Sequence, residues 1–161
     1  MRLVDSAERA IELIDSDEFV WCHSMAATPT RLLDALARHA LSRSNITLMQ
    51  LHLENADTVT APELDGRLRH RCFFAGKQTR ELINQGRADY VPLFLSELPK
   101  LFRRREQKID TVLVQVSPPD RHGNCSLGIS VEATAAACEV AGRIIAHINP
   151  RMPRTHGDGF I

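Results

Sequence analysis

IDTVLVQVSPPDRHG, residues 109 to 123, joins the most strand-like run of this sequence to a turn. The first eight residues alternate β-branched side chains with others, a pattern typical of a strand. Pro118 and Pro119 then end the strand, because proline has no amide hydrogen to give to a sheet. Asp120 to Gly123 has the composition of a turn. The stretch therefore predicts a strand over residues 109–116, followed by a loop.

On both sides of this stretch, short apolar runs alternate with amphipathic segments. The apolar runs predict further strands at residues 19–22, 46–49, 89–91 and 144–148. The amphipathic segments predict helices over residues 6–14, 29–40, 78–84, 95–105 and 131–141. Thr28 resembles an N-cap, with Pro29 at the first helical position. Residues 53–70 are polar and irregular, and the apolar pattern resumes at Cys72.

The alternation of strands and helices predicts an α/β fold, in which a mostly parallel sheet carries helices on both faces. The 161 residues are 43% hydrophobic and 25% charged, which is ordinary for a globular chain with a sizeable core. No internal repeat or low-complexity linker divides the sequence. We therefore expect residues 1–161 to form a single domain.

The charge balance excludes two classes of partner. Lysine and arginine together number 20, as do aspartate and glutamate, so no net charge favours nucleic acid or a membrane surface. The apolar runs are too short to cross a bilayer, and the N-terminus lacks the apolar core of a signal peptide, which predicts a cytoplasmic protein. The four cysteines have no CxxC spacing, and no HxH or HExxH pattern occurs, so we expect reduced, buried thiols and no metal.

Ligands of parallel sheets usually bind beyond the carboxyl ends of the strands. Three predicted loops fall there, at residues 23–29, 117–123 and 149–159. The first leads into a helix, whose free amide groups favour a carboxylate or phosphate, and Ser24 and Thr28 could add hydroxyl donors. The alternative for Thr28 is that it only caps its helix. Neither GxGxxG nor GxxxxGK[ST] occurs, which leaves dinucleotide and P-loop functions without support.

The second loop contains a carboxylate and an imidazole two residues apart. Asp120 could orient His122, or both could belong only to a turn, and the residues alone favour the turn.

Four segments, in order, carry a family resemblance: TPTRLLDAL, FFAGKQTRELINQGRADYVPLFLSELPKLF, IDTVLVQVSPPDRHGNCSLGISVEAT and INPRMPRTHGDG. From about Phe19 onward the chain resembles the amino-terminal half of the acetyl-CoA hydrolase/transferase family, which includes 4-hydroxybutyrate and acetate CoA-transferases. The resemblance implies a CoA-transferase (NagB/RpiA-like) domain. It also implies transfer of CoA between short-chain carboxylic acids through a glutamyl-CoA thioester, with the CoA thioester as substrate and no permanently bound cofactor.

The chain departs from this family in three places. It ends at Ile161, whereas the nucleophilic glutamate and the glycine-rich oxyanion segment of relatives belong to a carboxyl-terminal catalytic domain, which we expect to be absent here. No glutamate of this chain matches that nucleophile, so none is assigned a catalytic role. Residues 23–27 lack the glycines common in relatives, and Gly159 replaces a more usual hydroxyl residue.

The active site of the family lies between its two domains, so the loops of this half would line the acyl or carboxylate pocket. Ser24 and Thr28 are the first candidates to bind the carboxylate, and His52 is a further one. Asp120 and His122 match the SPPDxHG string of the family and would shape the loop and brace the interface. Residues Asn149, Pro153, Thr155 and Gly157 match its NxxMPxTxG string.

The leading hypothesis is an amino-terminal CoA-transferase domain, inactive alone, whose partners are acyl-CoA, short carboxylic acids, a carboxyl-terminal domain and a second copy of itself. The alternative is a stand-alone small-molecule-binding or interaction module that keeps the fold without catalysis. A lone half should expose an apolar patch, whereas a natural module should be polar there. A third hypothesis, an enzyme like the sugar-phosphate isomerases, requires Asp120 and His122 as an acid/base pair.

Overall fold

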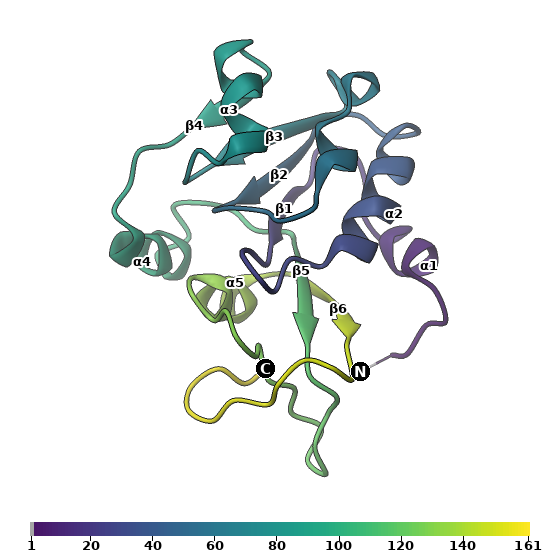
Figure 1. The fold of residues 1–161 in the computed structure, drawn as a ribbon, viewed down its shortest axis with the longest axis vertical. Coiled ribbons are helices and arrows are strands. Elements are labelled where there is room, and N and C mark those ends of the chain that lie inside the picture. Colours follow the sequence, from purple (N-terminus) through teal and green to yellow (C-terminus); the bar gives the residue numbers. More distant parts are fainter. Residues whose placement is uncertain (1) are drawn as a thin grey trace.

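One parallel sheet of six strands organises the molecule, as the alternating pattern predicts. In this computed structural model, which describes residues 2–161, all neighbouring strands are parallel, in the order β4-β3-β2-β1-β5-β6 (Figure 1). The strands are β1 (Phe19–Cys22), β2 (Ile46–Gln50), β3 (Leu68–Cys72), β4 (Ala88–Tyr90), β5 (Thr111–Val116) and β6 (Arg143–Ile148).

Helices cover both faces of the sheet, which confirms the predicted fold class (Figure 1). One face carries α1 (Ala7–Ile11), α2 (Thr30–Ala40) and α3 (Lys77–Asn84). The other carries α4 (Leu98–Arg103) and α5 (Thr134–Val140). Short 3₁₀ turns lie at Asp57–Thr60, Pro62–Leu64 and Leu95–Glu97.

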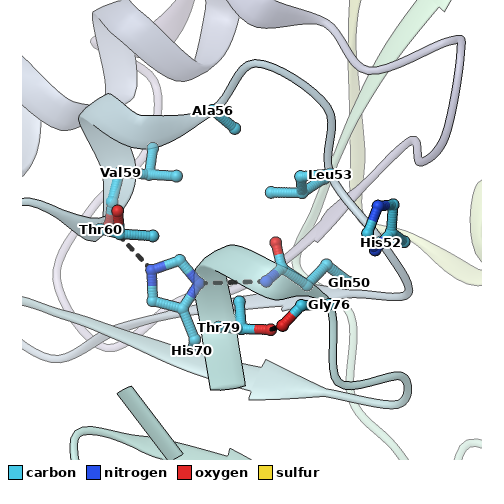
Figure 2. Close-up of a pocket in the computed structure, with 9 residues that line it drawn as sticks. All are labelled: Gln50, His52, Leu53, Ala56, Val59, Thr60, His70, Gly76 and Thr79. Atoms are coloured by element: carbon cyan, nitrogen blue, oxygen red, sulfur yellow. Dashed lines mark hydrogen bonds between the residues drawn. The ribbon is translucent and has the colours of Figure 1, made fainter. Parts of the chain in front are cut away.

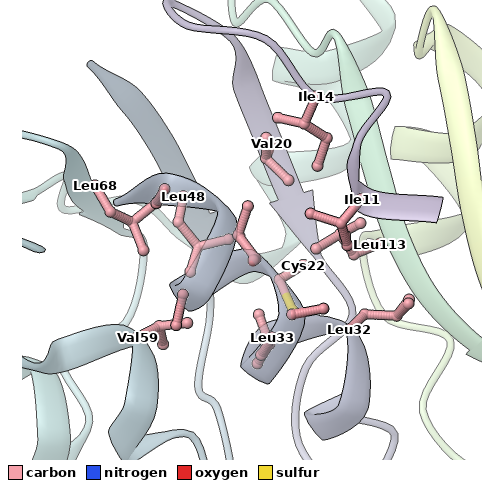
Figure 3. Close-up of a cluster of buried hydrophobic side chains, with 14 of the residues drawn as sticks. Ile11, Ile14, Val20, Cys22, Leu32, Leu33, Leu48, Val59, Leu68 and Leu113 are labelled. Atoms are coloured by element: carbon pink, nitrogen blue, oxygen red, sulfur yellow. The ribbon is translucent and has the colours of Figure 1, made fainter. Parts of the chain in front are cut away.

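Each face buries its own apolar core. On the first face, Leu33 of α2 packs in one cluster with Val20 and Leu48 of the sheet (Figure 3). Leu36 of the same helix belongs to this cluster, and all four are fully buried. On the second face, Trp21 lies edge-on to Phe102, with ring centroids 5.0 Å apart. Because successive strand residues point to opposite faces, β1 supplies both cores.

Two expectations about the elements are wrong. Thr28 is not the N-cap of α2: the helix begins at Thr30, and Pro29 occupies the capping position without a side-chain bond. The polar segment 53–70 also hides β3, in which Leu68, His70 and Cys72 point inward. Arg69 faces outward and Arg71 lies half-buried, so the strand has the period of two but carries two charged residues among its five.

The cysteines largely match the expectation. Cys22, Cys72 and Cys125 are buried free thiols, and Cys138 is half-buried.

Within residues 2–161, no helix has the length and apolar character needed to span a bilayer.

Candidate functional site

The strand order reverses direction between β1 and β5, because β2, β3 and β4 extend the sheet from β1 on one side and β6 follows β5 on the other. Helices α2 and α5, which follow these two central strands, lie on opposite faces. In α/β sheets this arrangement opens a crevice at the carboxyl ends of the two strands, where ligands bind. The candidate site is therefore the edge at which the loops after β1, β2 and β5 meet.

Hydroxyl groups join the loops after β1 and β2. The Ser24 hydroxyl donates to the Cys22 carbonyl at 3.1 Å and accepts the Leu51 N–H at 3.3 Å. The Thr28 hydroxyl donates to the Met25 carbonyl at 2.7 Å and accepts the Glu54 N–H at 3.1 Å. Both side chains are buried, so their hydroxyls hold backbone groups of this chain, and their binding of a substrate carboxylate stays a prediction.

Met25 supplies a left-handed turn where relatives were expected to use glycine. Its φ is 55°, and its N–H donates to the His52 carbonyl at 2.7 Å. A residue with a side chain adopts this conformation only when its surroundings hold it there. The loop after β1 is therefore fixed by its contacts, while the Met25 side chain is 47% exposed at the edge.

His52 follows β2 and is bonded through one ring nitrogen only. Its Nε2 lies 3.0 Å from Glu54 Oε1, and its ring stands edge-on to Phe74, with centroids 6.4 Å apart. Its Nδ1 is buried without a partner among the described residues. Gly76 packs directly against this ring, because a Cβ there would lie 2.4 Å from His52 Nδ1. The backbone of the loop after β3 thus sets the position of the imidazole.

A small cavity lies behind His52, between β2, β3 and the turn at Asp57–Thr60 (Figure 2). Its volume is about 10 Å³, which is the space that one water molecule needs. The His70 ring is held between the Val59 carbonyl, 2.8 Å from Nε2, and the Gln50 amide nitrogen, 3.3 Å from Nδ1. Burial lowers the pKa of His70. The cavity is too small for a carboxylic acid in this conformation.

Asp120 shapes the loop after β5. Its Oδ1 accepts the N–H groups of His122 at 2.8 Å and Asn124 at 2.9 Å, and its Oδ2 accepts from Arg154 at 2.7 Å. The bonds from the backbone, led by that of Asn124, hold the pKa of Asp120 below its usual value, although burial opposes the shift. Its contact with His122 is through the backbone and not through the ring. The isomerase hypothesis thereby loses the geometry on which it depended.

The loops after β5 and β6 pack on each other. Ser126 and Phe160 form an antiparallel bridge, and the Leu127 N–H donates to the Gly159 carbonyl at 2.8 Å. A Cβ at Gly159 would lie 2.9 Å from Val131, so glycine suits the close approach here. The family-like strings at residues 117–128 and 149–161 therefore form one braced structure.

His23, which the sequence analysis did not select, extends β1 into the site. Its Nδ1 accepts the Gln115 N–H at 3.4 Å, and its Nε2 contacts the Ser130 carbonyl. The ring is fully buried, and burial lowers its pKa. This pair of partners fits a neutral imidazole that carries its proton on Nε2.

Glu132 is the second residue that the sequence analysis passed over for the site. Its Oε1 accepts the N–H of Ser24 at 3.1 Å, and its Oε2 accepts that of Ala133 at 3.2 Å. Burial raises the pKa of Glu132 to about 7, even though these bonds oppose the shift. A carboxyl group that titrates near neutrality therefore lies at the reversal point of the sheet.

Within the described residues, no three side chains of histidine, cysteine, aspartate or glutamate gather as a metal site would require.

Comparison with known proteins agrees with this architecture. All 161 residues match the acetyl-CoA hydrolase/transferase N-terminal domain. The chain is 40% identical over 142 residues to a succinyl-CoA:acetate/propanoyl-CoA:succinate CoA transferase of Fasciola hepatica, covering 88% of this chain and 30% of that protein. It is 35% identical over 156 residues to the 4-hydroxybutyrate coenzyme A transferase of Clostridium kluyveri, covering 97% and 36%.

Solved structures give the same result. RipA from Yersinia pestis superposes with a TM-score of 0.88 at 28% identity, over 98% of this chain and 39% of that one. A 4-hydroxybutyrate CoA-transferase from Porphyromonas gingivalis superposes with a TM-score of 0.80 at 27% identity, over 98% and 36%. The chain thus spans about a third of the length of the curated relatives that it matches. By sequence over its whole length and by fold, the chain belongs to the acetyl-CoA hydrolase/transferase family, whose amino-terminal domain it matches.

Proposed function

We propose that this chain is the amino-terminal half of an enzyme that moves CoA between short-chain carboxylic acids or hydrolyses acyl-CoA. The observation that carries the proposal is the family match over residues 1–161. Two relatives named above are CoA transferases that act on succinate, acetate, propanoate or 4-hydroxybutyrate by name. The CoA-transfer assay with several acids identifies the acid that the enzyme uses.

The reaction would proceed through a covalent intermediate on a carboxyl-terminal domain. A glutamate carboxylate of that domain attacks the acyl-CoA carbonyl, which gives an acyl-glutamyl anhydride and releases CoA thiolate. The thiolate then attacks the glutamyl carbonyl, so that a glutamyl-CoA thioester forms and the first acid leaves as a carboxylate. An acceptor carboxylate runs the two steps in reverse, so that it leaves as a new acyl-CoA and the glutamate is regenerated. In a hydrolase, water attacks the glutamyl-CoA thioester instead, which releases CoA and regenerates the glutamate. The present half would line the pocket for the acid with the loops after β1 and β2, near Met25 and His52.

Exposed apolar side chains at the loop edge support a half-enzyme over a stand-alone module. Met25, Phe74, Phe94 and Ile129 follow β1, β3, β4 and β5, and their exposed fractions are 47%, 61%, 83% and 55%. Large exposed apolar groups beyond the carboxyl ends of four strands favour a surface that another domain covers. A polar edge would instead favour the binding module.

The first experiment measures CoA transfer from acetyl-CoA to propanoate, succinate and 4-hydroxybutyrate. It uses this chain alone, the separately made carboxyl-terminal part of the Fasciola hepatica relative alone, and the two mixed. We expect activity only in the mixture, because the nucleophile belongs to the other part.

A variant of this chain tests whether the two parts contact each other at the loop edge. Phe74→Asp places a charge on an exposed ring position, so the chain should keep its far-ultraviolet circular dichroism and lose most of the activity of the mixture. Activity of this chain alone would contradict the assignment of the nucleophile. An inactive mixture, together with binding of short acids by this chain alone, would favour the binding module.

A further inference from the structure

Glu132 is connected to the core under α5 by a chain of hydrogen bonds. The Thr134 hydroxyl donates to Glu132 Oε1 at 3.2 Å, and the Trp21 indole N–H donates to the Thr134 oxygen at 2.9 Å. Since the same Oε1 accepts the Ser24 N–H, one carboxylate oxygen joins the loop after β1 to the buried indole.

Glu132 has a strained backbone and a part-buried carboxylate, and both are unfavourable to folding. Its φ is 36°, a left-handed backbone angle that is unfavourable for a residue with a side chain. Within residues 2–161, the carboxylate has no cationic partner closer than 4.0 Å, although it is part-buried. A neutral amide would satisfy the donors of Ser24 and Thr134 without burying a charge. A carboxyl group in this position therefore points to a role that uses its ionisation.

The Ser24 amide, which Glu132 binds, belongs to the loop after β1 in the candidate site. Ser24 immediately precedes Met25, whose own N–H is held by the His52 carbonyl. Two successive amides of a loop without glycine are thus bound by acceptors on different elements, one of them Glu132. Hydrogen bonds to an ionised acceptor are roughly twice as strong as those to a neutral one.

We propose that Glu132 is a positioning residue, which holds the loop at residues 23–29 in its ligand-binding conformation when ionised and holds it less firmly when protonated. The proposal rests on the proposed function, because that function makes this loop a wall of the acid pocket. Burial places the change near neutrality, since it raises the pKa of Glu132 to about 7. Among the titratable groups near it, burial and then the charge of Glu132 raise the pKa of the Cys22 thiol well above its usual value. The His23 imidazole precedes Ser24 in the chain, and burial lowers its pKa.

The first test follows the only tryptophan of the chain, Trp21, which requires no substrate or second domain. Its fluorescence is recorded in the 161-residue chain from pH 5.5 to 8.5. We expect a transition with a midpoint near pH 7, because ionisation of Glu132 changes the partner of the hydroxyl that binds the indole. Glu132→Gln should abolish the transition and keep the fold. Glu139→Gln, the same change at an exposed position of α5, should leave it intact.

The second test measures how strongly Glu132 protects the loop at residues 24–28 from amide hydrogen exchange. At pH 8, we expect amide hydrogen exchange in residues 24–28 to be roughly tenfold faster in Glu132→Ala than in the unchanged chain, as loss of a charged hydrogen bond implies. Glu132→Gln, which is neutral like the protonated acid but keeps an acceptor for the Ser24 N–H, should exchange more slowly than Glu132→Ala and faster than the unchanged chain. A transition that survives in Glu132→Gln, or equal exchange in all folded variants, would overturn the proposal. Either outcome is independent of whether the mixture transfers CoA, so the two proposals fail separately.

Discussion

The buried carboxyl of Glu132 makes a specific prediction about stability as a function of pH. Its pKa is raised from 4.5 to about 7, so the folded chain holds a proton that the unfolded chain has already lost. Stability is then fully present below about pH 4.5 and falls as the pH rises to about 7. Each unit of pKa difference corresponds to about 1.4 kcal/mol, so a rise from 4.5 to about 7 gives a full loss of at most about 3.5 kcal/mol.

Glu132→Gln removes this titration. Between pH 5 and pH 8 the variant should therefore gain about 2 kcal/mol relative to the unchanged chain, on top of a constant difference from the altered bond to Ala133. Urea unfolding at several pH values, followed by circular dichroism, gives both free energies of unfolding.

The control for this prediction is Glu139→Gln. Glu139 is bonded to Arg103, and this bond lowers the pKa of Glu139. Its contribution to stability is therefore lost as the pH falls below about 4.5 and does not change between pH 5 and pH 8. The difference between Glu139→Gln and the unchanged chain should stay constant from pH 5 to pH 8. If the stability curves of the unchanged chain and Glu132→Gln run parallel over that range, Glu132 does not titrate near neutrality and the reasoning is refuted.

Three further outcomes follow from the site. Gly76→Ala should lower the melting temperature, at a cost of about 1 to 3 kcal/mol, because its Cβ would collide with the His52 ring. Ser24→Ala should cost about 1 to 3 kcal/mol in urea unfolding, because the buried N–H of Leu51 loses its acceptor; an unchanged midpoint would contradict the bond. The lowered pKa of Asp120 gives stability that is present above about pH 4 and lost as the pH falls further. In Asp120→Asn, the free energy of unfolding should therefore depend less on pH below about 4.

The sequence predicted the central elements well because their patterns are local. Residues 109–116 combine β-branched composition with a proline stop, and β5 occupies Thr111–Val116. The strand β3 was missed because its exposed positions carry arginine, which conceals the alternation in a polar region. Its identity depends on partners: it is paired to β2 over five residues, a contact that no short window contains.

For the candidate site too, the sequence predicted the position of several residues but not their long-range bonds. Ser24 and Thr28 were selected as hydroxyls near a helix terminus, and the structure places both at the expected edge. Their bonds, however, go to the backbone of the loop after β2, a neighbour that is distant in sequence. Asp120 was predicted to shape its loop, and its bonds to the backbone can be anticipated from turn chemistry alone.

Glu132 was passed over because its significance comes from a contact across 108 residues, with the amide of Ser24. One local signal was available. The residues after it, TAAACEV from Thr134 onward, form a helix of small side chains that packs closely on the sheet. A carboxyl group at the entrance to such a helix cannot extend far from the core, so it must either find donors or shift its pKa, and here it does both. An acidic residue that adjoins a small-residue helix next to a central strand is therefore a candidate for a positioning role.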